Sequence, residues 1–329
     1  MVERVSQLTY LEAISSGLRE EMTKDSNVVL MGEDIGTYGG AFRVTKGFLE
    51  KFGPQRVMDT PLAELGIVGA AIGMSYMGFK PVVEFQFIDF ISCGFDQIVN
   101  FAATSRYRWG VPAPIVLRGP WGGGVRAGMF HSRNIEMWFV HSPGIKVVTP
   151  GTVRDAKGLI KSAIRDPDPV LYLEHKFLYR RLKDDLPEGE EILTPIGKAE
   201  VVLEGDALTI VTYGMMRTLS LEAAAELAKE GIHVEVVDLR TLFPLDRATV
   251  IESVRKTNRL LIVHEDTRTG GIAGEIAISV TEEAFDSLDA PIRRVTAPDT
   301  PVPYAPTLED YYLPQVGDIV KAARKLAKY

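Results

Sequence analysis

The chain has one cysteine, few histidines and no long apolar run, and each of these shortages excludes a class of protein. Cys93 is the only cysteine in 329 residues, which excludes an internal disulfide and a multi-cysteine metal site. The histidines, at positions 131, 141, 175, 233 and 264, do not show metal-ligand spacings. The longest apolar stretch, residues 67–79, is shorter than the roughly 20 residues that span a bilayer. The first six residues contain no apolar signal core, so a reducing cytoplasm is the expected location.

The chain also lacks a surplus of basic residues. Its net charge is −7, which does not favour binding to nucleic acid or to an anionic membrane. Hydrophobic residues make up 46% and charged residues 25%, as in ordinary soluble globular proteins. A chain of this length is expected to form about two domains.

Two stretches of alternating helix and strand patterns are separated by a charged segment. In the first, the patterns predict helices over 8–22, 64–77, 95–106 and 153–165, and strands over 27–31, 81–85, 114–117, 145–148 and 170–173. In the second, they predict strands over 207–212, 234–238, 260–263 and 292–295, and helices over 220–229, 249–256, 274–284 and 316–327. This alternation predicts an α/β fold with a mainly parallel sheet. Two domains are expected, residues 1–195 and 196–329, and the first is expected to end in a linker over residues 179–195.

The segment of residues 59–69 places an acid at the start of a predicted helix. Pro61 favours an extended entry, and Glu64 falls in the first turn of a helix that is rich in small residues. A carboxylate at that position is stabilised by the exposed amides and the helix dipole, which would explain Glu64 without any catalytic role. A catalytic acid is the alternative interpretation.

A second segment follows the predicted strand of residues 81–85 and contains Gln86 and Phe90. Ligands of open α/β sheets bind beyond the carboxyl ends of the strands, so both residues are candidates for lining a pocket. A core position for Phe90 and a loop position for Gln86 fit the pattern equally well.

A glycine-rich loop, residues 119–132, contains three consecutive glycines and leads to His131. Consecutive glycines do not favour a helix or an ordinary strand, and the loop matches neither the dinucleotide-binding nor the P-loop pattern. An isolated histidine is more often structural than catalytic. Because loops on rigid scaffolds often carry function, His131 is nevertheless a second candidate catalytic residue.

Taken together, these segments resemble the beta subunit of the decarboxylase component of pyruvate and branched-chain 2-oxoacid dehydrogenase complexes. The matching strings run in order along nearly the whole chain. They include Gly32-Glu33-Asp34, Val57-Met58-Asp59-Thr60-Pro61-Leu62, Phe95-Asp96-Gln97 and Asp238-Leu239-Arg240-Thr241-Leu242. The resemblance implies an N-terminal domain that binds the pyrimidine end of thiamine diphosphate, and a C-terminal domain of the transketolase C-terminal type.

The resemblance also implies roles for individual residues. Glu64 matches the acid that hydrogen-bonds a pyrimidine ring nitrogen and so helps to activate the cofactor. Leu62, Gln86 and Phe90 match positions in the same pocket, and His131 matches a histidine that assists reductive acylation of lipoamide. A potassium site of some members, formed mainly by backbone carbonyls, matches Ile115, Ala163, Ile164, Asp166 and Asp168.

The chain lacks the Gly-Asp-Gly motif through which thiamine enzymes hold the diphosphate by way of magnesium. Because burying a diphosphate without a cation is very unfavourable, the missing half of the site is expected from an alpha subunit. The resemblance implies a heterotetramer of two alpha and two beta subunits. It further implies docking of a lipoyl acyltransferase, for which Asp289 and the terminal carboxylate of Tyr329 are candidate anchors.

The sequence leaves the substrate open between pyruvate and a branched-chain 2-oxoacid. An acetoin dehydrogenase beta subunit, or another split transketolase-like enzyme, shares the cofactor and the partner architecture. A non-catalytic scaffold subunit is the alternative of another class. Retention of both Glu64 and His131 in the matching positions argues against the scaffold.

Overall fold

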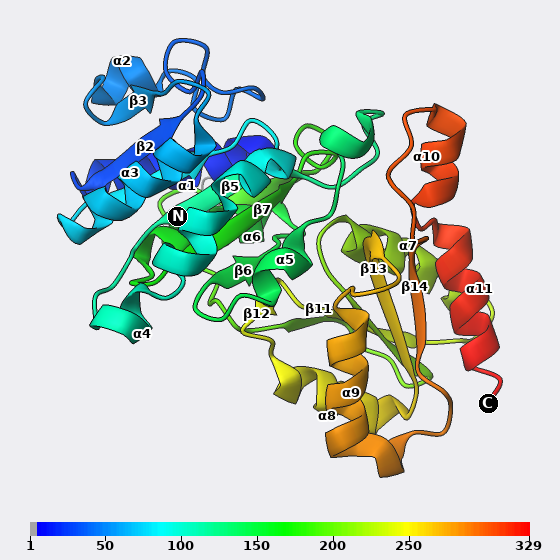
Figure 1. Ribbon diagram of the computed structural model, residues 1–329. Helices are drawn as coiled ribbons and strands as arrows, with labels where there is room; N and C mark the ends of the chain where they lie inside the picture. The colour runs from blue at the N-terminus through cyan, green and yellow to red at the C-terminus, as the bar shows by residue number, and fades with distance from the viewer. Residues whose placement is uncertain (1–4) are drawn as a thin grey trace. The chain divides into compact units, whose positions relative to one another are not determined.

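The computed structural model describes residues 5–329, which divide into two compact units (Figure 1). The first unit contains the described residues up to Trp121 together with Trp138–Ile196. The second contains Gly122–Met137 and Gly197–Tyr329, so the segment that carries His131 groups with the C-terminal residues. Within residues 5–329, no helix has the length and apolar character that crossing a membrane requires.

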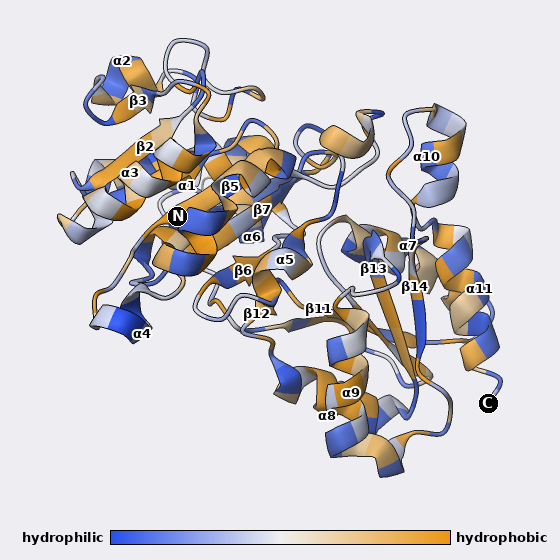
Figure 2. Ribbon diagram, viewed as in Figure 1, coloured by the Kyte–Doolittle hydropathy of each residue, from blue (hydrophilic) through white to orange (hydrophobic). Residues whose placement is uncertain are grey.

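The first unit is built on a parallel sheet with the strand order β6-β7-β5-β4-β2-β3. These strands are β2 Val28–Gly32, β3 Val57–Asp59, β4 Lys80–Glu84, β5 Val116–Trp121, β6 Lys146–Val148 and β7 Val170–His175. Their apolar runs are continuous because helices cover both faces of a parallel sheet. The hydropathy colouring of Figure 2 shows the same concentration of hydrophobic residues in the strands. The strands expected at 27–31, 81–85, 114–117, 145–148 and 170–173 are confirmed to within a few residues.

The main helices of this unit are α1 Tyr10–Lys24, α2 Phe48–Phe52, α3 Glu64–Tyr76, α4 Ser105–Trp109 and α6 Val153–Arg165. α3 lies on one face of the sheet, and α1 and α6 pack together on the other (Figure 1). Thr9 and Glu12 form a capping box that starts α1. α1 and α6 approach closely at Gly17 because this residue has no side chain. A Cβ at that position would lie only 2.6 Å from Cγ2 of Ile160.

The single helix expected over residues 95–106 is wrong in its geometry. The 3-10 helix η1, Ile88–Gly94, is followed by a π-helix, η2, Gln97–Ala102, and then by α4. The amide of Ala103 donates to the carbonyl of Ile98, 2.9 Å away, which is the i to i−5 bond of a π-helix. An apolar period near 3.6 does not encode this wider turn, so the pattern predicted an ordinary helix.

The segment expected to be a linker contains a strand. β8, Lys183–Pro187, pairs antiparallel with β1, Val5–Thr9. After β8, the Glu191 carboxylate accepts from Nζ of Lys24 at 2.7 Å and from Nζ of Lys161 at 3.2 Å. These hydrogen bonds, first of all that from Lys24, lower the pKa of Glu191 to about 2. The charges that suggested an exposed linker therefore fasten this segment to α1 and α6.

The second unit is built on a sheet with the order β14-β13-β10-β11-β9, in which β9 is antiparallel to its neighbour. The strands of this unit are β9 Glu200–Leu203, β10 Leu208–Thr212, β11 Val234–Asp238, β12 Thr241–Phe243, β13 Leu260–Thr267 and β14 Arg293–Ala297. The four strands that were expected are confirmed, whereas β9 and β12 were not predicted.

Helices cover both faces of this second sheet. They are α7 Met215–Ala228, α8 Arg247–Thr257, α9 Ala273–Ala284, α10 Pro306–Tyr312 and α11 Val316–Leu326, with the short 3-10 helices η3 Gly128–Phe130 and η4 Phe285–Ser287. α7 and α11 pack over Ile210 and Leu261 in one apolar core. On the opposite face, the hydroxyl of Thr209 is 2.7 Å from those of Ser253 and Thr257 on α8. α10 was not predicted from the sequence.

Candidate functional site

Three strand ends of the first unit converge at one edge of the sheet. In the parallel register Gly32 of β2 pairs with Asp59 of β3 and with Glu84 of β4. The residues that follow these positions therefore leave the sheet together, at the edge where ligands of α/β folds bind. They are Glu33, Thr60 and Phe85.

Two carboxyl groups meet at this edge. Glu64 is the first residue of α3 and is partly buried, and no side chain caps the helix from the preceding residue. Burial raises the pKa of Glu33, and the nearby charge of Glu64 raises it further. Oε1 of Glu33 is buried and has no hydrogen-bond partner among the described residues. Both effects make Glu33 easier to protonate than a carboxyl group in water.

Glu33 was not singled out from the sequence, although Gly32-Glu33-Asp34 was one of the matching strings. The available signal was its position, because an acid directly after a fully buried strand lies at the ligand-binding edge of a parallel sheet. The sequence does not show that the charge of Glu64 acts on Glu33, since Glu33 follows β2 and Glu64 begins α3.

The other predicted cofactor-binding residues lie on the segments around the same edge. Nε2 of Gln86 donates to Oδ2 of Asp34 at 3.1 Å, so Gln86 is held beside the end of β2. Phe90 is partly buried in η1. Leu62 has 80% of its surface exposed, which is unusual for a leucine and leaves an apolar side chain without cover in this chain.

A buried cation joins β4, the last of these strands, to the neighbouring strands β5 and β7. The Arg118 guanidinium on β5 donates to Glu84 on β4, and its Nη2 donates to Oε2 of Glu174 on β7 at 2.7 Å. The hydroxyl of Tyr179 donates to the same Glu174 oxygen at 2.7 Å. Burial raises the pKa of Glu84, which favours one retained proton in a cluster of two acids and one cation.

His131 is in the second unit, directly after η3. It is partly buried, and its amide donates to the carbonyl of Gly128 at 3.2 Å. Gly122, Gly124 and Gly128 all have left-handed φ values, of +82°, +82° and +67°. A Cβ on Gly128 would also lie 2.2 Å from the ring of Tyr304. The glycines are therefore required by the backbone and packing of the loop itself.

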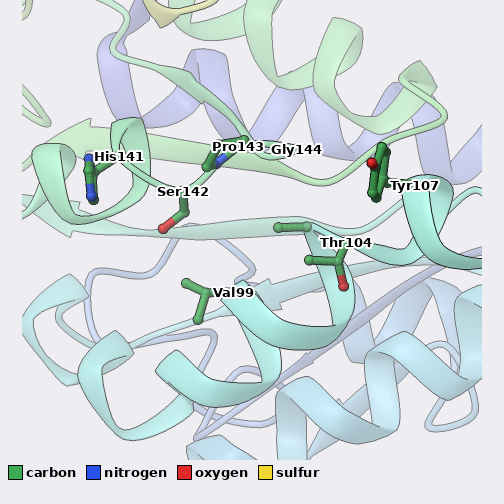
Figure 3. A pocket seen from close by; sticks show the side chains of 8 residues that line it. Val99, Thr104, Tyr107, His141, Ser142, Pro143 and Gly144 are labelled. Carbon is green, nitrogen blue, oxygen red and sulfur yellow. The ribbon is translucent and has the colours of Figure 1, made fainter.

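The other histidines occupy settings that differ from that of His131. Burial lowers the pKa of His264 to about 4, which keeps this ring neutral inside the second unit. His175 lies edge-on to Trp121, with ring centroids 5.2 Å apart, inside the first unit. His141 is exposed and lines a cavity of about 630 Å³ with Tyr107 and Gly144 (Figure 3). None of the residues predicted from the sequence lines that cavity.

The residues of the predicted potassium site are all in the first unit, and several of their polar groups have protein partners. The carbonyl of Ile115 accepts from the amide of Val170 at 3.0 Å, and that of Ala163 accepts from the amide of Asp166 at 3.3 Å. Nζ of Lys146 is 2.6 Å from Oδ2 of Asp166, and Nε of Arg106 is 2.6 Å from Oδ1 of Asp168. In residues 5–329, no three His, Cys, Asp or Glu side chains are grouped as a metal site.

The two candidate partner anchors are both accessible. The Asp289 side chain is 59% exposed and lies 3.8 Å from Nη2 of Arg259. Tyr329 is 56% exposed at the end of the chain. Phe285, close to Asp289 in the sequence, is 66% exposed.

Comparison with known proteins covers almost the whole chain. The transketolase pyrimidine binding domain matches residues 6–181, and the transketolase C-terminal domain matches residues 197–319. The 2-oxoisovalerate dehydrogenase subunit beta of Bacillus subtilis (strain 168) is 47% identical, and the alignment covers 99% of this chain and 100% of that protein. The pyruvate dehydrogenase E1 component subunit beta of the same organism is 46% identical, over 99% of this chain and 100% of that protein.

A plant relative and a solved structure agree with these matches. The mitochondrial pyruvate dehydrogenase E1 component subunit beta-2 of Oryza sativa subsp. japonica is 47% identical, over 97% of this chain and 86% of that protein. A solved split gene transketolase, described as an inactive beta4 tetramer, has a TM-score of 0.79 at 24% identity, with 98% of each chain covered. The last comparison shows likeness of fold.

Proposed function

The chain belongs to the family of beta subunits of thiamine-diphosphate-dependent 2-oxoacid dehydrogenases, and we propose that it carries the cofactor-activating acid and an acyl-transfer histidine of such an enzyme. Members of this family are oxidoreductase components that work with an alpha subunit. The observation that supports the proposal best is the Glu33–Glu64 pair at the carboxyl edge of the first sheet.

The residues at this edge fit the pyrimidine end of thiamine diphosphate. When bound, this cofactor supplies the electron sink for cleavage of the bond next to a carbonyl. Glu64 would hold a proton at its carboxylate toward a ring nitrogen, and the mutual influence of the two carboxyl groups, seen in the raised pKa of Glu33, supports this role. Gln86, Phe90 and Leu62 would line the walls. Magnesium and the diphosphate would be held by the alpha subunit, since this chain has no Gly-Asp-Gly motif.

The exposed face of α3 supports an alpha subunit packed against this unit. Leu62, Leu65 and Met77 are 80%, 50% and 79% exposed, and Gly66 and Gly73 lie exposed on the same helix. Small residues on a helix allow a partner backbone to approach closely, and large exposed apolar side chains mark an interaction surface. A partner that covers α3 would also cover Leu62 and enclose the space beside Glu64.

The substrate we propose is a 2-oxoacid, either pyruvate or a branched-chain one. The two Bacillus relatives, named for 2-oxoisovalerate and for pyruvate, are 47% and 46% identical, which does not separate the two. Turnover of the assembled enzyme on pyruvate, 2-oxoisovalerate and acetoin decides among them, and a preference for acetoin would overturn the proposal. The potassium site implied by the resemblance stays a prediction, which thermal unfolding in potassium against sodium chloride would check.

Replacement of Glu64 by Gln in the assembled enzyme should lower turnover on the order of 100-fold while leaving assembly intact. The amide cannot hold the proton that the carboxyl supplies, and proton transfer contributes on this scale. Decarboxylation measured with an artificial electron acceptor is the assay. Glu275→Gln is the matched control, because Glu275 also lies in the first turn of a helix, α9. Equal activity of the two variants would mean that Glu64 only stabilises its helix.

Replacement of Gly73 by Leu should prevent assembly with the alpha subunit while leaving the isolated chain folded. A Cβ on Gly73 meets nothing within 4 Å in this chain, and a better helix former adds up to about 1 kcal/mol of helix stability. Gly274→Leu in α9 is the control, because Gly274 is equally unobstructed. Sedimentation of mixtures with the alpha subunit reports the result. If the Gly73 variant forms a normal complex with the alpha subunit, α3 is not part of the interface.

Replacement of His131 by Ala should slow acyl transfer to a lipoyl domain on the order of 10-fold or more, and should slow decarboxylation much less. Opening of the lipoyl disulfide releases a thiolate that needs a proton, which an imidazole supplies near neutral pH. The two rates are measured on the same variant, one with the lipoyl domain and one with a dye as acceptor. An equal fall in both rates would make His131 a binding or structural residue.

Docking of the lipoyl acyltransferase should depend on the acidic segment around Asp289. Exposed acids beside an exposed Phe285 suit a basic partner with an apolar contact. We expect Asp289→Lys, or a tag after Tyr329, to weaken co-elution with the acyltransferase, more strongly at low salt. Glu222→Lys, at an exposed position on α7, is the charge-matched control. Unchanged co-elution after both changes would place the docking surface elsewhere.

A further inference from the structure

The loop that precedes His131 is held by a buried carboxylate from α10. Glu309 is fully buried, and both of its oxygens accept hydrogen bonds from the loop. Oε1 accepts from the amide of Gly124 at 2.9 Å. Oε2 accepts from the amide of Arg126 and from its Nη1, both at 3.0 Å. One side chain thus receives three donors from two residues of the loop.

Neighbouring groups of the second unit complete this hold. The amide of Gly123 donates to the Glu265 carboxylate of β13. The Arg126 guanidinium also donates to the carbonyl of Pro306 at 3.0 Å and to Oδ1 of Asp310 at 2.7 Å. α10 itself is anchored by Tyr312, which packs with Ala297 and Val302 in a small apolar cluster. The support beneath the loop is therefore a fixed part of the second unit.

The conformation of the loop depends on Glu309 for two physical reasons. A buried carboxylate is stable only when donors replace its lost water, and these donors come largely from the loop. Arg126 has a left-handed φ of +63°, an unfavourable conformation for a non-glycine residue, and Glu309 binds both its amide and its guanidinium. Loss of the carboxylate removes the partner of the strained residue and leaves the amide of Gly124 without its acceptor.

His131 lies between this clamp and a second fixed point. On the other side of the histidine, the hydroxyl of Tyr213 donates to Oε1 of Glu136 at 2.7 Å, and both side chains are buried. The amide of His131 donates a hydrogen bond to the Gly128 carbonyl in the loop. Buried carboxylates of the second unit thus hold the backbone both before and after the histidine.

We propose that Glu309 is a positioning residue for His131: its buried carboxylate clamps the loop at Gly124 and Arg126 and so sets the imidazole for proton delivery during acyl transfer. This inference rests on the role proposed above for His131. Under this proposal the C-terminal unit contributes to acyl transfer, because Glu309, the residue that orders the loop, belongs to α10.

The test compares Glu309→Gln with Asp310→Asn in the assembled enzyme. Gln keeps the size of the side chain but turns an NH₂ group toward a donor of the loop. Asp310→Asn is the matched control, since Asp310 contacts the same arginine but accepts no loop amide. We expect amide exchange at Gly124 and Arg126 to rise at least 10-fold with Glu309→Gln and less than 2-fold with Asp310→Asn. Unchanged exchange in the Glu309 variant would overturn the clamp.

Kinetics test the positioning role separately from the clamp. We expect Glu309→Gln to slow acyl transfer to the lipoyl domain on the order of 10-fold and to slow dye-coupled decarboxylation by a clearly smaller factor. Combined with His131→Ala, it should add no further loss of acyl transfer, because both changes act through one imidazole. A double variant in which the two losses multiply would show that Glu309 acts independently of His131 and would overturn the proposal.

Two further outcomes separate the role of Glu309 from the role of His131. If His131→Ala alone lowers both rates equally, the role of His131 fails, and the positioning role of Glu309 in acyl transfer fails with it. The exchange measurement would still decide whether Glu309 clamps the loop. Should Glu309→Gln fail to assemble, Glu309→Asp keeps the charge on a shorter side chain, and we expect the same ratio of rates with smaller changes. Equal slowing of both rates by Glu309→Asp would count against positioning.

Discussion

The ligand-binding edge of the first sheet depends on one buried cation, the guanidinium of Arg118. It joins three neighbouring strands, since it binds Glu84 of β4 and Glu174 of β7 from its own place on β5. Removal of one partner from such a cluster leaves an uncompensated buried charge, typically at a cost of about 3–5 kcal/mol. The segment with Gln86 and Phe90 starts directly after Glu84, so the ion cluster fixes the point from which these side chains leave the sheet.

Buried carboxylates organise both functional regions, but by different means. At the edge of the first sheet, burial and the charge of Glu64 raise the pKa of Glu33, and its Oε1 has no hydrogen-bond partner among the described residues. In the second unit, the Glu309 carboxylate has three hydrogen bonds from the loop and serves as an acceptor. The number of donors available to each buried acid decides whether its pKa rises or whether it serves as a hydrogen-bond acceptor that holds a loop.

The two candidate catalytic residues belong to different units of the chain. Glu64 belongs to the first unit, while the segment with His131 groups with the C-terminal residues. The exposed leucines and glycines of α3 give the first unit an apolar face without a partner in this chain. Both features, like the lack of a Gly-Asp-Gly motif, suit a subunit whose site is completed by a second chain.

The sequence by itself determined the alternating strands and helices and the acid at the start of α3, and it singled out His131 as a candidate. Apolar periodicity and helix-end signals are local, so they can be read without knowing which segments meet. Only the tertiary structure decided the pairing of β8 with β1, the π-helical turn before Ala103 and the effect of the Glu64 charge on Glu33. The same holds for Glu309, which acts on a loop whose amides lie 185 and 183 residues earlier in the chain. Side-chain hydrogen bonds over such separations leave no periodic signal, because they depend on which elements the apolar cores bring together.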